Sequence, residues 1–302
     1  MTITITGAGG FLGQRVTRLL AERGEKLVLA DLVPPANPPE GATVLTGNLA
    51  ETLPEAITKD TTAVIHLAAV VSAGAEADFA HGYRVNLTGL RAVLERCRNL
   101  ATRPKFLFTS SLAVFGAVDR VDDGTATMPQ SSYGTQKAIG ELLVNDYGRK
   151  GYIDGRTLRL PTVVIRPGKP NAAASSFASG ILREPLAGEK SICPVSPDLA
   201  LWIASPASVT KALVHALDLP DDALVPWRVL NVPGITVTVR EMMQALGRAG
   251  GDTGLVTFER DPAIEAIVGS WPALFDTPRA LALGFPEADD LDTVIQSHID
   301  GL

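Results

Sequence analysis

The first half of the chain alternates short apolar runs with longer stretches in which apolar residues recur at helical spacing. The short runs predict strands, and runs that are apolar at consecutive positions are typical of strands buried on both faces. They lie at Thr2–Thr6, Lys26–Ala30, Thr43–Leu45, Ala63–Leu67, Lys105–Thr109 and Arg156–Val164. The helical patterns lie at Phe11–Arg23, Tyr83–Cys97 and Ser132–Lys150. This alternation predicts an α/β fold with a doubly wound parallel sheet covered by helices on both faces.

Beyond Pro167 the pattern becomes irregular. Gly168–Ser179 is rich in Ala, Ser, Gly and Pro and has few periodic apolar positions, which predicts a loop. A strand-like run at Arg228–Val232 is expected to return to the large sheet, and a helix is expected after Thr238. The sequence therefore predicts a sheet domain over residues 1–166 and a smaller C-terminal lobe over most of residues 167–302.

Composition and charge exclude several classes of protein. Of the 302 residues, 46% are hydrophobic and 20% are charged, which excludes a disordered chain. The 27 Lys and Arg residues are outnumbered by 33 Asp and Glu, and the basic residues are scattered, so no nucleic-acid partner is expected. No apolar run reaches the roughly 18 residues that a membrane span needs.

Neither the cysteines nor the histidines form a pattern that indicates a disulfide or a metal site. Cys97 and Cys193 belong to no CxxC or Cys/His cluster, and the four histidines lack metal-ligand spacing. The apolar N-terminus has no basic leader and is interrupted by glycines, so a strand and turn explain it better than a signal peptide. We expect a cytoplasmic protein without a bound metal.

A glycine-rich loop follows the first predicted strand and opens the first predicted helix. Gly7, Gly10 and Gly13 stand three residues apart in Thr6–Gly13. Such glycines permit a tight turn, close approach of the backbone to a pyrophosphate, and close packing of helix on sheet, with the anion at the helix N-terminus. In this strand–turn–helix context, the loop predicts dinucleotide binding.

Asp31 ends the second predicted strand, at the distance from the loop expected of a ribose-binding acid. Its carboxylate would accept hydrogen bonds from the adenosine ribose and repel a 2′-phosphate. The residue therefore predicts NAD rather than NADP as the cofactor, although a solvated loop carboxylate is the alternative interpretation.

Tyr133 and Lys137 lie four residues apart and so share one face of a predicted helix. An ammonium group favours the ionised form of a nearby phenol, so the pair can remove a proton from an alcohol. Ser111 follows a buried strand, where its hydroxyl would project at the carboxyl edge of the sheet, the edge at which open α/β sheets bind ligands. Together with the glycine loop, these residues predict an alcohol dehydrogenase site.

These motifs, with His66-Leu67-Ala68-Ala69 and Asn86, resemble those of the extended short-chain dehydrogenase/reductases over essentially the full chain. The resemblance implies a Rossmann NAD-binding domain and a catalytic set of Tyr133, Lys137, Ser111 and Asn86. It further implies a homodimer through a four-helix bundle built from the Tyr83–Cys97 and Ser132–Lys150 helices. The NAD-binding residues that it implies are Gly7, Gly10, Phe11, Leu12, Gly13, Asp31, Asn48, Leu49, Leu67, Ala68, Ala69, Tyr133, Lys137 and Pro161.

Two features distinguish among branches of this family. Ser110-Ser111-Leu112 lacks the acid that dehydratases carry beside the serine. Ala200 stands where nucleotide-sugar epimerases typically have the arginine that binds the diphosphate, and burying an unpaired diphosphate is costly. A nucleotide-sugar 4-epimerase with tightly bound NAD stays open as an alternative, because this alignment can slip by a residue or two.

The segment from Arg159 to Gly180 resembles the branch that oxidises C2 of a four-carbon sugar acid, D-erythronate, with NAD. Its hydroxyl, amide and cationic donors suit a polyhydroxy carboxylate, although a polar surface loop is the alternative. The candidate substrate-binding residues are Ser72, Ser111, Asn171, Ser175, Ser176 and Arg183. We therefore expect an NAD-dependent dehydrogenase of a small sugar acid; a module that binds NAD without turnover is the third, weaker hypothesis, since such proteins usually lack the Tyr/Lys pair.

Overall fold

A parallel seven-stranded sheet forms the centre of the molecule, in the order β10-β6-β5-β4-β1-β2-β3. The computed structural model describes residues 1–168 and 173–301. The sheet strands are β1 (Thr2–Thr6), β2 (Lys26–Asp31), β3 (Thr43–Thr46), β4 (Ala63–His66), β5 (Lys105–Ser111), β6 (Asp154–Leu160) and β10 (Val229–Asn231). The strand order reverses at β1, so the carboxyl ends of β1 and β4 border the crevice where such folds bind ligands. The predicted doubly wound α/β fold is confirmed.

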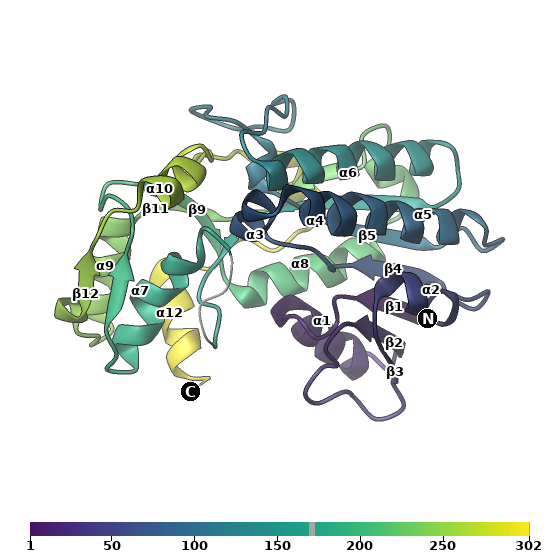
Figure 1. Ribbon diagram of the computed structural model, residues 1–302, viewed down its shortest axis with the longest axis horizontal. Helices are drawn as coiled ribbons and strands as arrows, with labels where there is room; N and C mark the ends of the chain where they lie inside the picture. Colours follow the sequence, from purple (N-terminus) through teal and green to yellow (C-terminus); the bar gives the residue numbers. More distant parts are fainter. Residues whose placement is uncertain (169–172, 302) are drawn as a thin grey trace.

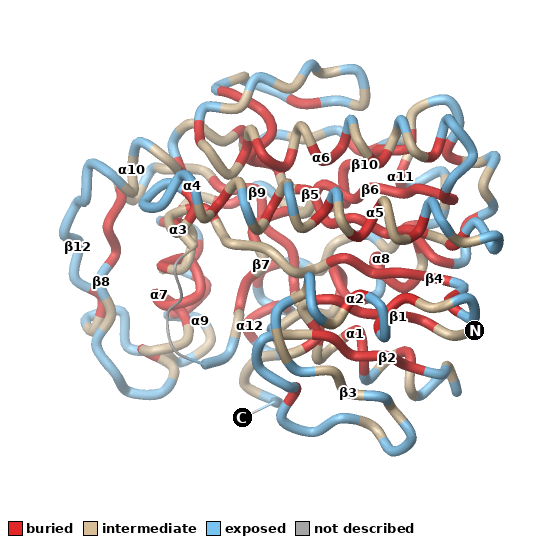
Figure 2. Tube along the Cα trace, turned by 45° about the vertical axis from the view of Figure 1, so that its right-hand side comes forward, coloured by how far each residue is buried: buried red, intermediate tan, exposed pale blue. Residues whose placement is uncertain are grey.

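Helices cover both faces of this sheet (Figure 1). On one face, α1 (Phe11–Glu22), α8 (Pro206–Asp218) and α11 (Pro278–Ala282) share a buried apolar core with the strands. On the other face, the core is formed with α2 (Leu49–Ala56), α5 (Leu90–Arg98) and α6 (Ser132–Arg149). Figure 2 shows the central strands buried along most of their length, as expected of strands enclosed between two helix layers.

A second apolar core lies in a group of elements that we call the small lobe. In Figure 1 they gather at the left, beyond the ends of the central strands. The helix α9 (Val239–Arg248) begins with a reciprocal capping box between Thr238 and Glu241, a sequence signal for a helix start. The lobe comprises α7 (Ser176–Leu186), β8 (Ser191–Cys193), β9 (Ala200–Ala204), β11 (Ile235–Thr238), α9 (Val239–Arg248), η4 (Thr253–Leu255), β12 (Val256–Phe258), α10 (Pro262–Gly269) and α12 (Leu291–Ile299).

Three predicted elements differ from those observed. The strand expected at Arg156–Val164 is divided at Pro161, because proline has no N–H to continue the ladder. Its continuation, β7 (Thr162–Val163), pairs instead with β9 in a second, three-stranded sheet. The helix expected at Tyr83–Cys97 is a succession of α4 (Phe79–Tyr83), the π-helical turn η1 (Arg84–Gly89) and α5. The loop expected to extend to Ser179 ends earlier, since α7 begins at Ser176.

The remaining described elements are short connections: α3 (Ser72–Ala77), η2 (Leu112–Val114) and η3 (Asp221–Leu224). Within residues 1–168 and 173–301, no helix is both long and apolar enough to cross a bilayer. The same residues bring together no group of three His, Cys, Asp or Glu side chains fit to hold a metal ion.

Candidate active site

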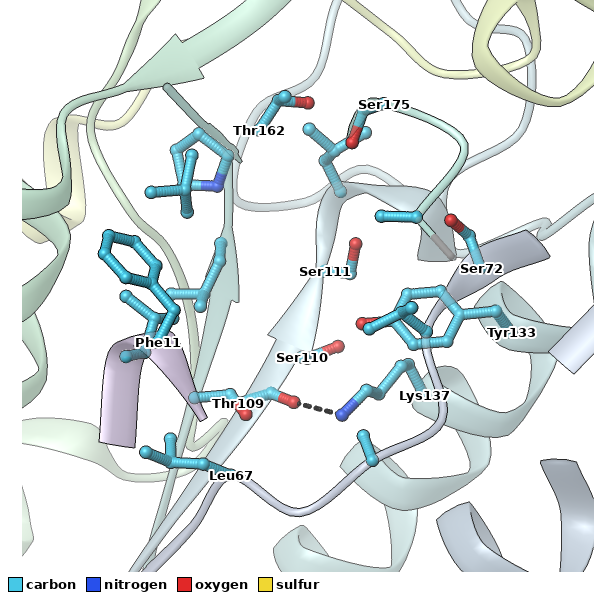
Figure 3. A pocket seen from close by; sticks show the side chains of 18 of the residues that line it. Phe11, Leu67, Ser72, Thr109, Ser110, Ser111, Tyr133, Lys137, Thr162 and Ser175 are labelled. Carbon is cyan, nitrogen blue, oxygen red and sulfur yellow. Dashed lines mark hydrogen bonds between the residues drawn. The ribbon is translucent and has the colours of Figure 1, made fainter. Parts of the chain in front are cut away.

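A cavity of about 330 Å³ opens at the carboxyl edge of the central sheet, between the glycine loop and the small lobe. Figure 3 shows side chains from β5, α6, the glycine loop and the segment before α7 pointing into it. Thirteen of the sequence-predicted site residues line it: Gly7, Gly10, Phe11, Leu12, Gly13, Leu67, Ala69, Ser72, Ser111, Tyr133, Lys137, Pro161 and Ser175. Residues from β1 to the loop before α7 thus meet in one place.

The glycine loop adopts the geometry that its spacing predicts. Gly7 has a φ of 76°, and a Cβ there would lie 2.6 Å from the backbone nitrogen of Ala68. A Cβ on Gly13 would lie 2.3 Å from the carbonyl oxygen of Gly7. Side chains at these two positions would force the loop away from β4 and from α1, so close packing requires glycine at both.

The N-terminus of α1 faces the cavity without a side-chain cap. Gly10 is the capping residue and has no side chain to occupy the first N–H groups, and no acidic residue stands in the first turn. A helix N-terminus of this kind attracts an anion through its free N–H groups and its dipole. At the end of β2, Asp31 accepts a hydrogen bond of 2.8 Å from the Gly9 backbone, which fixes the carboxylate beside the loop. Both features fit a dinucleotide.

Two glycines allow α6 to lie close against β5 and the turn after it. A Cβ on Gly134 would lie 2.1 Å from the carbonyl oxygen of Ala113, and one on Gly140 would lie 2.7 Å from the ring of Phe108. Tyr133 directly precedes Gly134, and Lys137 lies between Gly134 and Gly140. These close contacts therefore hold both side chains over the end of β5. The cap at Ser131, which accepts a 3.1 Å hydrogen bond from Gly134, fixes where the helix begins.

Tyr133 is partly buried in the cavity wall, and its phenol is hydrogen-bonded to Ser111. Burial raises the pKa of Tyr133 to about 12, while the Ser111 hydrogen bond and the Arg166 guanidinium act to lower it. These two groups, rather than the ammonium of Lys137, are therefore the ones that favour the phenolate in this geometry. The pairing of Tyr133 with Ser111 is suited to hold a substrate oxygen and receive its proton.

Lys137 crosses above β5, where its Nζ donates a 2.7 Å hydrogen bond to the carbonyl oxygen of Thr109 (Figure 3). The Nζ also lies 5.6 Å from the centre of the Tyr133 ring. Burial lowers the pKa of Lys137 to about 7, against the opposing effect of Glu141 one helical turn further on. The lysine side chain therefore changes charge near neutral pH.

A buried ionic network lies directly beneath these residues. Arg159 on β6 donates two hydrogen bonds to Glu141 on α6, at 2.9 and 2.7 Å. Ser110 donates a third hydrogen bond to the same carboxylate. The guanidinium of Arg159 also lies 4.6 Å from the centre of the Phe115 ring. The network links α6, β5 and β6 at the level of the cavity floor.

Several expected cofactor and catalytic residues lie outside the cavity lining. Asn86 is buried in η1, where its amide bonds both backbone groups of Val70, at 2.8 and 2.9 Å, and the side chain of Gln136, at 2.6 Å. Asn48 caps α2 through the amide of Ala50, and Leu49 begins that helix. Asn86 thus connects the chain after β4 to α6; whether it also takes part in catalysis stays a prediction.

The candidate substrate residues are divided between the cavity and its surroundings. Ser72 and Ser175 line the cavity, and Ser72 Oγ also accepts a 2.9 Å hydrogen bond from the Ala174 backbone. Arg183 is not part of the lining: its guanidinium pairs with Glu184 and donates to the carbonyl oxygen of Arg166. Ser176 begins α7 outside the lining, and Asn171 lies outside the described residues.

Residues that the sequence reasoning did not select also line the cavity. Thr109 and Ser110 of β5 are polar lining residues of this kind, and Thr162, Arg166 and Trp271 come from the crossing into the small lobe and from the segment after α10. The sequence contained a signal for Arg166, because this charged residue directly follows the apolar run Val163–Ile165. Ser111 was selected on the same kind of signal, a polar residue at the end of an apolar strand. Nothing local in the sequence indicated Trp271.

The chain belongs to the NAD dependent epimerase/dehydratase family, whose model matches residues 3–219. It is 50% identical to a D-erythronate dehydrogenase of Cupriavidus necator, over 99% of this chain and 98% of the relative. It is 46% identical to a D-erythronate dehydrogenase of Haemophilus influenzae, over 99% of both chains. A solved structure described as a nucleoside-diphosphate-sugar epimerase from Agrobacterium tumefaciens has a TM-score of 0.91 and 40% identity, covering 99% of this chain and 94% of that one.

The predicted membership of this family is therefore confirmed. The fold and these relatives define an NAD-dependent oxidoreductase that acts on a CH–OH group. The open helix N-terminus and the glycine cradle fit the cofactor that the family uses.

Proposed function

We propose that this protein oxidises the C2 hydroxyl of D-erythronate to give 2-dehydro-D-erythronate, with NAD as the oxidant. The observation that carries the proposal is the meeting of Tyr133, Ser111 and Lys137 with the glycine loop in a single cavity. An alcohol bound there would lie between a proton acceptor and the site of a dinucleotide. The names of two relatives at 50% and 46% identity supply the substrate.

In this proposal NAD is held by the N-terminus of α1 and the glycine loop, with Asp31 at the ribose, Leu67 and Ala69 along its length, and Pro161 at the nicotinamide end. When bound, it supplies the acceptor for the hydride that leaves C2. Asn48 and Leu49 would contact the adenine from the start of α2, and Ala68 supports the loop through its contact with Gly7.

The chain's own residues orient the alcohol and move its proton. Ser111 holds the C2 oxygen beside Tyr133, and Tyr133 in its phenolate form takes the hydroxyl proton on Oη as the C–H bond breaks. Ser111 and the Arg166 guanidinium favour the charge that develops on the phenol, and the Lys137 Nζ lies 5.6 Å from the centre of the Tyr133 ring. Tyr133 is partly buried in the cavity wall, which limits the access of bulk water to the proton being transferred. The products are a 2-keto acid, NADH and a proton.

A panel of substrates tests this function directly. Purified protein with NAD is incubated with D-erythronate, with other four- to six-carbon aldonic acids, and with UDP-sugars, and NADH formation is followed by absorbance. We expect NADH with D-erythronate and a 2-keto acid as the product. Interconversion of a UDP-sugar without net NADH, and no reaction with any acid, would instead establish the epimerase alternative.

We also propose a separate binding role for each of the two parts of the chain, and a homodimer. Residues 1–166 with β10 would bind NAD, and most of residues 167–302 would enclose the substrate. Two copies in a cytoplasmic enzyme would pair through α5 and α6, which lie side by side in Figure 1. Leu142 on α6 is 60% exposed, so Leu142→Glu should convert a dimer to a monomer in sedimentation experiments. An unchanged sedimentation coefficient would exclude this interface.

A further inference from the structure

The charge of the cavity wall is one-sided. Its described lining contains two cationic side chains, Lys137 and Arg166, and no Asp or Glu. Lys137 is engaged by the Thr109 carbonyl oxygen on the floor of the cavity. Arg166 is therefore the cationic side chain of the described lining on the side nearer the small lobe.

Within residues 1–168 and 173–301, the guanidinium of Arg166 has no protein acceptor. Among the described residues it forms neither an ion pair nor a hydrogen bond, whereas its neighbour Arg183 is paired with Glu184. Burial and the proximity of Arg183 both lower the pKa of Arg166, as expected of a cation taken partly out of water without a counter-charge. A partly buried cation without a counter-charge is stabilised when an anion binds to it.

The backbone of Arg166 is fixed on both sides. Its N–H donates a 3.0 Å hydrogen bond to Ser179 Oγ, and its carbonyl oxygen accepts from the guanidinium of Arg183. Both partners belong to α7, so the residue is held by the small lobe rather than by the sheet. Arg166 is also near enough to Tyr133 to lower the pKa of the phenol. An anion on Arg166 would thus lie beside the proposed reacting oxygen.

A second unpartnered donor lines the same cavity. The indole Nε1–H of Trp271 is buried and has no acceptor in the described part of the chain. A planar guanidinium offers paired N–H groups that match the two oxygens of a carboxylate. With Trp271 as a further donor, the arrangement suits a carboxylate group attached to the carbon that bears the reacting hydroxyl.

We propose that Arg166 binds the carboxylate of the substrate and determines the preference for a 2-hydroxy acid over a neutral polyol. The inference rests on the proposed function, and it reassigns the expected cationic contact from Arg183 to Arg166. In this assignment Arg183 is a positioning residue, which acts through the Arg166 backbone. Ser72 and Ser175 then face the hydroxyl groups of the substrate.

The first test compares an acid with its neutral counterpart. Steady-state rates are measured with D-erythronate and D-erythronamide for the unchanged protein, Arg166→Gln and Arg166→Lys, with Arg240→Gln as a matched loss of an exposed cation. We expect Arg166→Gln to lose about 100-fold or more in kcat/KM for the acid and little for the amide, because removing one partner of an enclosed charge pair has effects of this size. Arg166→Lys should fall between, and Arg240→Gln should match the unchanged protein.

Cofactor binding separates this assignment from a role in holding NAD. The KM for NAD should change little in Arg166→Gln. A rise in that KM with no change in the preference for acid over amide would overturn the proposal. So would an equal loss on both substrates, since that result would show a structural effect rather than recognition of the carboxylate.

A binding measurement keeps the inference separate from turnover. D-Erythronate is titrated calorimetrically into Tyr133→Phe and into Tyr133→Phe/Arg166→Gln, both saturated with NAD. We expect binding to the first and at least tenfold weaker binding to the second. Equal binding to both, or binding to neither, would overturn the role of Arg166. Absence of NADH formation by the unchanged protein, together with the expected binding difference, would refute the proposed function alone.

Discussion

Replacing Glu141 by Gln is the perturbation whose effects the structure defines most fully. The carboxylate accepts two hydrogen bonds from Arg159 and one from Ser110, and the two charged side chains are only 2% and 5% exposed. The substitution keeps the size of the side chain and leaves the Arg159 cation buried without its counter-charge. Removing one partner of a buried pair lowers the free energy of unfolding by about 3–5 kcal/mol.

The assay for this loss is reversible urea unfolding, followed by tryptophan fluorescence at pH 7.5. Asp292→Asn is the matched control, because it removes the carboxylate of an Arg248 ion pair of similar length, 2.7 Å, whose side chains are 57% and 63% exposed. An exposed pair contributes about 1 kcal/mol or less. If the two variants lose the same free energy, within about 1 kcal/mol, the buried network does not stabilise the fold more than an exposed ion pair does.

The same variant has a separate effect on activity. Glu141 opposes the lowering of the Lys137 pKa, so its replacement should lower that pKa below about 7 and reduce the fraction of charged lysine at neutral pH. We expect the alkaline decrease attributable to lysine in the pH profile of kcat/KM to move to lower pH. A merely structural network would change stability without moving this part of the profile.

Three further predictions concern single side chains. Lys137→Met should abolish turnover yet raise the free energy of unfolding at pH 7 by about 2–4 kcal/mol in chemical denaturation, because lowering the lysine pKa from 10.5 to about 7 destabilises the folded protein. This gain in stability should shrink toward pH 10, where the lysine of the unfolded chain also loses its charge. A gain that stays constant with pH would contradict this cause. His66 is buried, and burial lowers its pKa to about 3. Below pH 6.5 the unfolded chain therefore binds a proton that the folded chain does not bind, so stability falls as pH decreases. His66→Asn should remove about 2 kcal/mol of the loss between pH 7 and 4.5, measured by urea midpoints; an unchanged loss would assign acid unfolding to other groups. Asp31→Ser should raise kcat/KM for NADP at least tenfold relative to that for NAD, and an unchanged ratio would remove the carboxylate from cofactor selection.

The sequence predicted the glycine loop, Tyr133, Lys137 and Ser111 as cavity residues because each depends on local pattern. A strand followed by glycines at three-residue steps defines its own turn, and two residues four apart on a helix share a face whatever lies around them. The strands β1 and β2 likewise lie within a residue of the ranges expected from their apolar runs.

Other parts depend on contacts that no local pattern contains. The division of the expected strand at Pro161 follows from the missing N–H, but the pairing of Thr162 in β7 with Ile203 in β9 depends on a segment far along the chain. From the sequence, Arg183 and Arg166 are equally good candidates for a ligand contact. The structure shows that the Arg183 guanidinium pairs with Glu184 and donates to the Arg166 carbonyl oxygen, whereas the Arg166 guanidinium is available for a ligand. Trp271 reaches the cavity through packing of the small lobe.

The most direct test of the central claim compares the unchanged protein with Tyr133→Phe, which removes one oxygen and keeps the ring packing. NADH formation from D-erythronate and NAD is measured from pH 7 to pH 10, with NAD binding followed in parallel by quenching of tryptophan fluorescence. We predict that the unchanged protein forms NADH in this range and that Tyr133→Phe binds NAD normally but loses at least 1,000-fold in kcat at every pH, because it lacks the oxygen that accepts the proton. Substantial turnover by Tyr133→Phe, with NAD bound, would contradict the assignment of Tyr133 as the proton acceptor.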